Sequence, residues 1–452
     1  MNRHDEDRDG LERELTSFQQ GMIAVGCIIG VGLFLGSGAT IGLAGPGVIV
    51  TYLLGAIVAL AMGLVLAEMA TVHPVSGGFG VYADEYVGPW AGFLTRITYW
   101  FAEMLALGAL VTAVGVYFGY WFPNTPGWIF MLVAAALAVS VNALHVGRFG
   151  FLESAFSVLK VAAIALFVVL GTGIVLRQGF ENLTGHGGFF PNGASGVGLA
   201  LTLVLASFLG IEAVAITAAE ARQPERTVPR ALVGLVGILI VLYVGSMLIV
   251  VTVTPWRTVA ETSGTLTGSP FVTVFTGAGV PYAGSVMNLV VVSTALTAVI
   301  SHLYLATRML YSLAREGYAP SALGVVDDRG VPVRALAVST GGLILAVVLA
   351  AYGQQAFLPL YGTAVTALLV IWLLIFFCHA RFRRRLPAEK LAGLRVRVPA
   401  HPLPSIAASV IILAALATTP WVAGLTWTVP MFLVWLVLAG SGYAIWSRRT
   451  TH

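Results

Sequence analysis

Residues 26–38 read Gly-Cys-Ile-Ile-Gly-Val-Gly-Leu-Phe-Leu-Gly-Ser-Gly and lie inside an apolar run over residues 18–44. Five of these thirteen residues are glycines, and each glycine costs a helix about 1 kcal/mol relative to alanine. The run is nevertheless long and apolar enough to cross a bilayer. It therefore predicts a membrane-spanning helix that breaks in its middle, where free backbone groups line a buried binding site. The alternative is a face of small residues that packs closely against another helix.

The composition is typical of a multi-pass membrane protein. Of 452 residues, 58% are apolar and 10% are charged, with a mean hydropathy of +0.91. Soluble domains carry about a quarter charged residues. We predict twelve spans, at residues 18–44, 48–70, 92–121, 127–145, 151–176, 197–219, 231–254, 283–312, 334–352, 357–380, 403–420 and 426–446.

The basic residues orient these spans. With the N-terminus placed inside, Arg177 and Arg257 fall outside, Lys160 falls within a span, and the rest of the 24 lysines and arginines fall inside. This bias predicts a plasma-membrane protein with both termini cytoplasmic. The run Arg381–Arg385 is expected to anchor the inner surface and to contact anionic membrane lipid. Glu220 and the segment Pro224–Arg230 are expected to form a cytoplasmic loop.

Several classes of function are disfavoured. The basic residues lie in short loops, so we expect no nucleic-acid partner. The eight histidines are scattered, and the sequence contains no metal-ligand cluster, phosphate-binding loop or catalytic constellation, so we expect no metal, no cofactor and no enzymatic activity. A channel would need a continuous polar pore lining, whereas the polar groups within these spans cluster around one site.

A second interruption is predicted in the sixth span. Its sequence over 205–213 is Leu-Ala-Ser-Phe-Leu-Gly-Ile-Glu-Ala, which places Gly210 beside Glu212. The two interrupted spans are five apart, so the halves that contain them have opposite orientations in the membrane. Interrupted helices at matching positions of inverted halves predict a secondary transporter with a midplane site.

Four stretches resemble the amino acid–polyamine–organocation transporter superfamily, and within it the bacterial amino acid permeases. Their order and spacing fit over spans one to eight, whereas the last four spans match only as apolar helices. The stretches are Ile29–Gly38; Ala67–Met69 with Pro74–Gly80, Trp90–Phe93 and Tyr99-Trp100; Phe208–Glu212 with Ala219–Ala221, Pro224–Arg226 and Val228–Ala231; and Thr307–Pro320 with Gly330–Val333.

The resemblance implies a LeuT-type fold and amino acid transport by alternating access. In that fold, a cytoplasmic tail over residues 1–17 precedes a five-helix repeat over 18–176. A second, inverted five-helix repeat covers 197–380, and two peripheral helices cover 403–446. We expect proton-coupled import of a neutral or polar α-amino acid. The alternative is an amino acid exchanger, including one for a basic amino acid or a polyamine; the oligomeric state stays open.

The resemblance also implies a substrate site made of main chain. The carboxylate would meet backbone N–H groups of Gly30, Val31 and Gly32, where a half-helix presents the positive end of its dipole. The ammonium would meet carbonyls freed at Ile28 and at three residues of the second break, Phe208, Leu209 and Ile211. Phe208 resembles an aromatic cover over the substrate, with ordinary core packing as the alternative.

Lys160 matches a lysine that replaces a sodium ion in proton-coupled members of the superfamily. A buried lysine can release its proton, whereas an arginine stays charged. The alternative for Lys160 is a side chain that reaches back to the membrane interface. Glu212 resembles a gating or proton-handling acid, with a structural role as acceptor for freed N–H groups as the alternative.

Glu103 and His302 depart from the family pattern. Many permeases carry an acid one or two turns after Glu103, where this chain has Leu107 and Leu110, and a small residue at the position of His302. The two residues could contact the substrate side chain or titrate together as a pair. The alternative is a hydrogen bond between spans three and eight.

Overall fold

The computed structural model describes residues 14–30, 32–73, 77–262, 269–277, 282–352, 357–394 and 396–450. Over these ranges the regular secondary structure is helical, apart from one isolated β-bridge between Leu15 and Ala221. Eight of the described helices are long and apolar enough to cross a membrane, and three shorter apolar helices accompany them. This confirms the predicted all-α, multi-pass architecture, while the count of twelve spans and the division into two repeats stay predictions.

The helix bounds lie close to the predicted spans. The longer helices are α3 (Val48–Ala70), α5 (Pro89–Phe118), α6 (Gly127–Asn142), α7 (Val146–Gln178), α10 (Pro224–Val253), α13 (Ala283–Arg315), α14 (Val333–Tyr352), α15 (Phe357–Arg385), α17 (Leu403–Thr418) and α18 (Thr428–Thr450). The helices at the two predicted breaks are α1 (Ser17–Ile28), η2 (Gly32–Gly36), α2 (Ser37–Ala44), α8 (Gly193–Ala206), α9 (Ala213–Ile216) and η5 (Thr217–Glu220). Short connecting helices are η3 (Gly45–Gly47), α4 (Phe79–Tyr86), η4 (Glu181–Leu183), α11 (Trp256–Thr262), α12 (Pro270–Gly277), η6 (Ser321–Gly324), α16 (Ala388–Ala392) and η8 (Thr419–Trp421).

Local sequence signals fix where several helices begin. Thr16 and Gln19 form a reciprocal capping box at the start of α1, with Thr16 Oγ1 accepting from the Gln19 backbone N–H at 3.2 Å. Such a cap contributes about 1 kcal/mol. Helix α5 begins with Pro89, whose missing N–H costs nothing at a first helical position.

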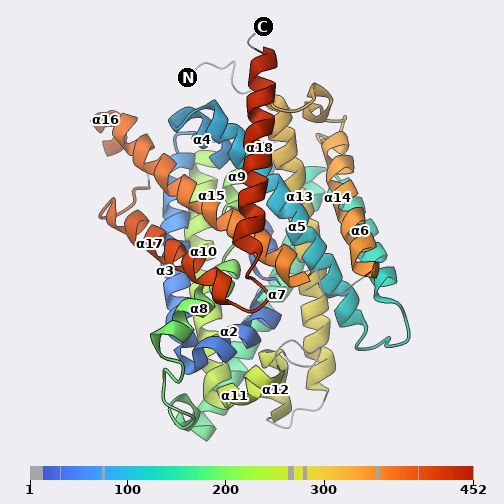
Figure 1. Ribbon diagram of the computed structural model, residues 1–452, viewed down its shortest axis with the longest axis vertical. Helices are drawn as coiled ribbons and strands as arrows, with labels where there is room; N and C mark the ends of the chain where they lie inside the picture. Colours follow the sequence, from blue (N-terminus) through green and yellow to red (C-terminus); the bar gives the residue numbers. More distant parts are fainter. Residues whose placement is uncertain are drawn as a thin grey trace.

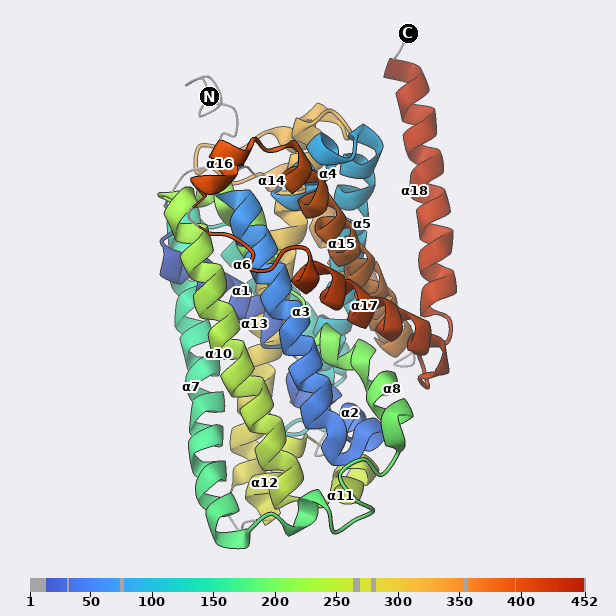
Figure 2. The same ribbon diagram turned by 90° about the vertical axis from the view of Figure 1, so that its left-hand side faces the viewer.

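Figures 1 and 2 show how the helices are arranged. Helices α4 and α16 lie at one end of the molecule, and α11 and α12 lie at the other (Figure 1). Helix α7 lies on one side of the bundle, and α18 stands apart on the opposite side (Figure 2). Apolar side chains on both are exposed, including Leu176, which is 76% exposed, and Val437, which is 68% exposed. These outer faces suit contact with lipid chains.

The structure corrects one expectation about the inner loops and places a predicted anchor. The segment Pro224–Arg230 is no loop but the first turns of α10, again with a proline at its first position. The run Arg381–Arg385 is the end of α15, and Arg383 binds Glu68 of α3 through two hydrogen bonds of 2.6 Å each. Arg383 thus ties two helices together, and contact of the run with anionic lipid stays a prediction.

Candidate functional site

The first predicted break lies where the glycines place it. Helix α1 ends at Ile28, and the chain resumes at Gly32 in the π-helical turn η2 before continuing into α2. Val31, one of the three residues predicted to bind the carboxylate, lies outside the described residues. The break exists because closely spaced glycines weaken the helix, and tertiary packing then holds the ends apart.

The second break lies between Ala206 and Ala213, where α8 ends and α9 begins. Gly210 has a φ of 106°, a conformation that side-chain-bearing residues rarely adopt. A Cβ at Gly210 would lie 2.8 Å from Cys27 and 3.0 Å from Ile28. The two breaks therefore pack directly against each other, as a site shared between two inverted halves requires.

A small cavity of about 30 Å³ lies at this crossing. The helices that enclose it are α1 and η2, α5, α8, α13 and α15, and most of the lining is apolar. Among the described residues, the lining consists of Cys27, Ile28, Gly30, Gly32, Ala106, Leu110, Ala206, Leu209, His302, Tyr361, Ala364, Val365 and Leu368. Five of the predicted site residues thus lie around this one cavity: Ile28, Gly30, Gly32, Leu209 and His302.

The backbone carbonyls at the breaks differ in availability. The carbonyl of Ile28 already accepts two hydrogen bonds, from the hydroxyl of Tyr243 at 3.0 Å and from the Gly30 N–H at 2.9 Å. No hydrogen bond to the carbonyls of Phe208, Leu209 or Ile211 is found within the described part of the chain. The predicted ammonium contacts therefore fit the second break better than Ile28.

Phe208 is placed away from the cavity. Its ring is fully buried and packs against Tyr243 and Tyr52, with ring centroids 5.1 and 6.2 Å apart. A Cβ on Gly55 of α3 would lie 2.7 Å from this ring. In this conformation Phe208 fills the interface between α8, α3 and α10, which matches the packing alternative.

Lys160 contacts the first break directly. Its side chain is buried, and its Nζ donates to the carbonyl oxygen of Gly26 near the end of α1 at 3.0 Å. The alternative that this side chain reaches the membrane interface is therefore wrong, because the ammonium ends inside the protein. The contact joins α7 to the interrupted helix.

Glu212 is held by three donors. Its carboxylate accepts from the Gly210 N–H at 3.1 Å, from Trp372 Nε1 at 3.2 Å and from the Tyr99 hydroxyl at 3.4 Å. One of these donors is a backbone group freed by the break, as the structural alternative predicts. Trp372 gave no sequence signal, since an aromatic residue within a span is ordinary, and Tyr99 belonged to a stretch that resembles the family without a predicted role.

Glu103 and His302 are bound to each other. His302 Nδ1 lies 2.6 Å from Glu103 Oε2, and both side chains are buried. The contact joins α5 to α13, and His302 also lines the cavity. The helix–helix hydrogen bond that the sequence offered as an alternative is therefore present, while joint titration and contact with the substrate stay predictions.

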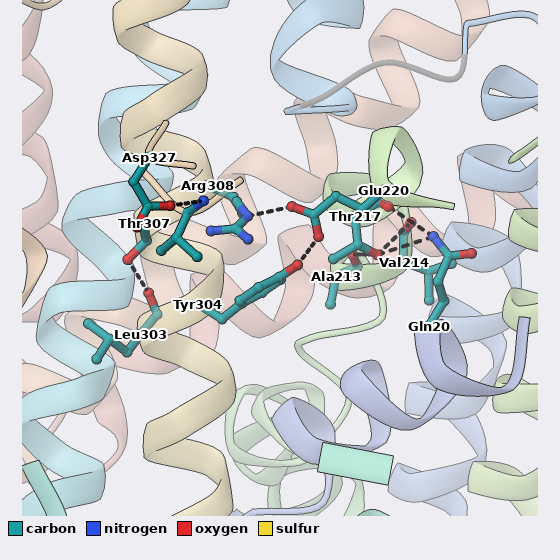
Figure 3. A network of polar contacts seen from close by, with 11 residues as sticks. Gln20, Ala213, Val214, Thr217, Glu220, Leu303, Tyr304, Thr307, Arg308 and Asp327 are labelled. Atoms are coloured by element: carbon teal, nitrogen blue, oxygen red, sulfur yellow. Dashed lines mark hydrogen bonds and ion pairs between the residues drawn. The ribbon is translucent and has the colours of Figure 1, made fainter. Parts of the chain in front are cut away.

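Glu220 also differs from its expected place in a cytoplasmic loop. It ends η5, is 1% exposed, and accepts from Arg308 Nε at 2.5 Å and from the Tyr304 hydroxyl. Figure 3 shows this carboxylate between the two α13 side chains, with Gln20 of α1 bound to Thr217 nearby. The cluster connects the end of the second interrupted helix to α13.

Sequence reasoning also missed Glu153, which is 0% exposed on α7. Ser301 of α13 donates to its Oε1 at 2.6 Å. A signal was available, because an ionisable residue seven positions before Lys160 lies on the same face of a helix.

Comparisons with known proteins agree with this architecture. A family model described as amino acid permease matches residues 19–451. The chain is 34% identical over 447 residues to the uncharacterized amino acid permease YtnA of Bacillus subtilis, covering 96% of each chain. It is 35% identical to the aromatic amino acid transport protein AroP of Escherichia coli K12, covering 96% of this chain and 95% of AroP. It is 36% identical to the gamma-aminobutyric acid permease of Bacillus subtilis, covering 86% and 84%. With a family model matched over nearly its whole length and two interrupted helices crossing at its centre, the chain belongs to the amino acid permease family, a family of membrane transporters.

Proposed function

We propose that this protein imports a neutral α-amino acid by alternating access and that an inward proton gradient drives the import. The observation that carries the coupling is the contact between Lys160 Nζ and the Gly26 carbonyl. A protonated Lys160 ties α7 to the interrupted α1, and loss of its proton removes that tie. The helices around the first break can then move against the rest of the bundle.

The lining of the cavity supports a neutral substrate. The side chains facing it from α5, α8 and α15 are mainly apolar, including Ala106, Ala206 and Val365. A cationic side chain would need a free carboxylate, but Glu103 is already bound to His302. Bringing an uncompensated charge into this space would be costly. A neutral substrate is therefore favoured over a basic amino acid or a polyamine.

The zwitterionic part of the substrate would be bound by the two breaks. Gly32 would offer its N–H group to the carboxylate at the start of a half-helix, and the Gly30 N–H would first have to give up its hydrogen bond to the Ile28 carbonyl. The carbonyls of Phe208, Leu209 and Ile211, which accept no hydrogen bond from the described residues, would accept from the ammonium. The relatives named for aromatic amino acids and for gamma-aminobutyric acid carry neutral zwitterions, which supports this class of substrate.

Purified protein in proteoliposomes tests the proposal. A thermal-shift screen of the twenty amino acids identifies the substrate first, since a ligand at about 100 times its Kd adds about 2.7 kcal/mol of stability. Uptake of that substrate is then measured with an imposed pH gradient, with and without a proton ionophore, and with sodium replaced by potassium. Accumulation that needs the gradient and ignores sodium supports the proposal. Counterflow without any response to the gradient would instead favour an exchanger.

A further inference from the structure

Glu153 is a buried ionisable group that the transport cycle described above does not use. Ser301 holds its Oε1, whereas its Oε2 has no hydrogen-bond partner among the residues that the structure describes. A buried carboxylate oxygen without a donor is unfavourable unless it is neutralised or receives a proton. This oxygen is therefore chemically suited to accept a proton.

Glu153 and Lys160 reach the same residue of α1. Lys160 binds the carbonyl oxygen of Gly26, and a Cβ on Gly26 would overlap Glu153 Oε1. Glycine at position 26 thus lets the carboxyl group lie against the α1 backbone. Seven residues, or about two helical turns, separate the acid from the lysine on one face of α7. The carboxyl group of Glu153 and the ammonium of Lys160 therefore lie beside the same residue of the interrupted helix, Gly26.

Among the residues that the structure describes, few charged or titratable groups face Glu153 from the surrounding helices. They are Lys160 on its own helix, His302 on α13 and Cys27 on α1. His302 is already bound to Glu103 of α5. Lys160 is therefore the cation whose proton Glu153 is best placed to receive.

The position of Glu153 along α7 indicates on which side of Lys160 it lies relative to the membrane. Glu153 lies nearer the start of α7 at Val146 than Lys160 does. The distribution of basic residues predicts that this end of the helix faces the cytoplasm. A proton that leaves Lys160 toward the cytoplasm would therefore pass Glu153.

We propose, on the basis of the proton coupling proposed above, that Glu153 relays the proton between Lys160 and the cytoplasm. An N–H bond of Lys160 breaks and an O–H bond forms at Glu153, which ends the tie to Gly26 and lets α1 move. The amine and the carboxylic acid are then both neutral. The acid next releases the proton to cytoplasmic water and returns to a carboxylate, so one proton has left the protein.

The test compares Glu153→Gln, Glu153→Asp and wild type in proteoliposomes. Glutamine keeps the size of the side chain but cannot carry the proton. Counterflow exchanges substrate on loaded carriers and needs no proton release, so E153Q should retain it. Accumulation driven by a pH gradient does need proton release, and in E153Q it should fall by at least about tenfold. E153D should recover part of that accumulation. Glu181→Gln, which removes an exposed carboxylate from η4, serves as the control for loss of charge alone.

Two results would overturn the relay. One is gradient-driven accumulation by E153Q at the wild-type level, and the other is loss of counterflow in folded E153Q, which would indicate a purely structural role. If E153Q is not recovered folded, Ser301→Ala replaces it. Removing the Ser301 donor favours the protonated acid, so the internal pH needed for half-maximal uptake should rise, and an unchanged pH profile would contradict the relay. A wild type that ignores the pH gradient would contradict the proposed coupling itself, whereas equal responses of wild type and E153Q contradict only the role of Glu153.

Discussion

The Nζ atom of Lys160 lies 3.0 Å from the carbonyl oxygen of Gly26, so a lysine of α7 is bound directly to the helix that breaks at the candidate site. The two residues are 134 positions apart in the sequence. In the proposed mechanism, this contact holds a proton at the part of α1 that alternating access would have to move. Replacing Lys160 therefore tests this contact directly.

Replacing Lys160 should abolish concentrative uptake. Lys160→Ala removes the tie to Gly26, and Lys160→Arg keeps a charge that cannot be released. Both variants should remain near equilibrium distribution when a pH gradient is imposed on proteoliposomes. Sodium-dependent accumulation by the wild type, or full gradient-driven accumulation by K160A, would show that Lys160 does not couple protons.

Gly32→Ala should prevent substrate binding with little loss of folded protein. Its new methyl group would lie 3.1 Å from the Tyr361 hydroxyl and 3.5 Å from Ser207 Oγ, where the substrate carboxylate is expected. Gly36→Ala in the same half-helix is the matched control, because a Cβ there has no neighbour within 4 Å among the described residues. Ligand-induced thermal shifts should be lost in G32A and kept in G36A.

The carboxylate site can also be tested from the substrate side. An analogue in which the carboxylate is reduced to an alcohol should not compete for uptake, because a neutral hydroxyl gains little from the N–H groups of a half-helix. Competition is measured with labelled substrate in proteoliposomes. An alcohol that competes as well as the parent amino acid would remove Gly30 and Gly32 from the binding site.

Changing the pair of Glu103 and His302 should alter which amino acids are transported. His302→Gly enlarges the cavity and leaves Glu103 without its partner, whereas Glu103→Ala leaves the ring of His302 at the lining. Each change should reorder the uptake rates of a panel of amino acids. A double variant compared with both single variants isolates the energy of the contact itself. An unchanged order in variants that still transport would assign the pair to helix packing alone.

Glu220→Gln should destabilise the protein markedly. It breaks a pair in which both side chains are at most 4% exposed, leaving Arg308 buried without its counter-charge. Breaking one partner of a buried pair costs about 3–5 kcal/mol. The matched control is Asp327→Asn, which weakens the exposed pair with Arg329 and should cost about 0–1 kcal/mol. Thermal unfolding in detergent compares the two, and equal shifts would contradict the assigned role of Glu220.

The two interruptions and the all-α, multi-pass architecture could be predicted from the sequence alone. These features depend on local properties of the sequence. Clustered glycines weaken a helix wherever they occur, and the length of an apolar run can be counted directly from the sequence. The start of α1 at Ser17 and that of α5 at Pro89 follow from local capping and proline rules. The expected loop at Pro224–Arg230 was wrong, although the proline that begins α10 was itself a helix-start signal.

Which side chains contact one another could not be predicted from the sequence, because the contacts join distant parts of the chain. Glu103 and His302 are 199 positions apart, and Glu220 and Arg308 are 88 apart, so no local pattern links them. Whether an intramembrane side chain faces lipid, a cavity or another helix depends on how each helix is rotated and crossed against its neighbours. That rotation directs Phe208 into the packing around Tyr243, and it brings Glu153 and Lys160 together at Gly26. A buried charged group needs a partner among the side chains packed around it, and those side chains come together only when the whole helix bundle has formed.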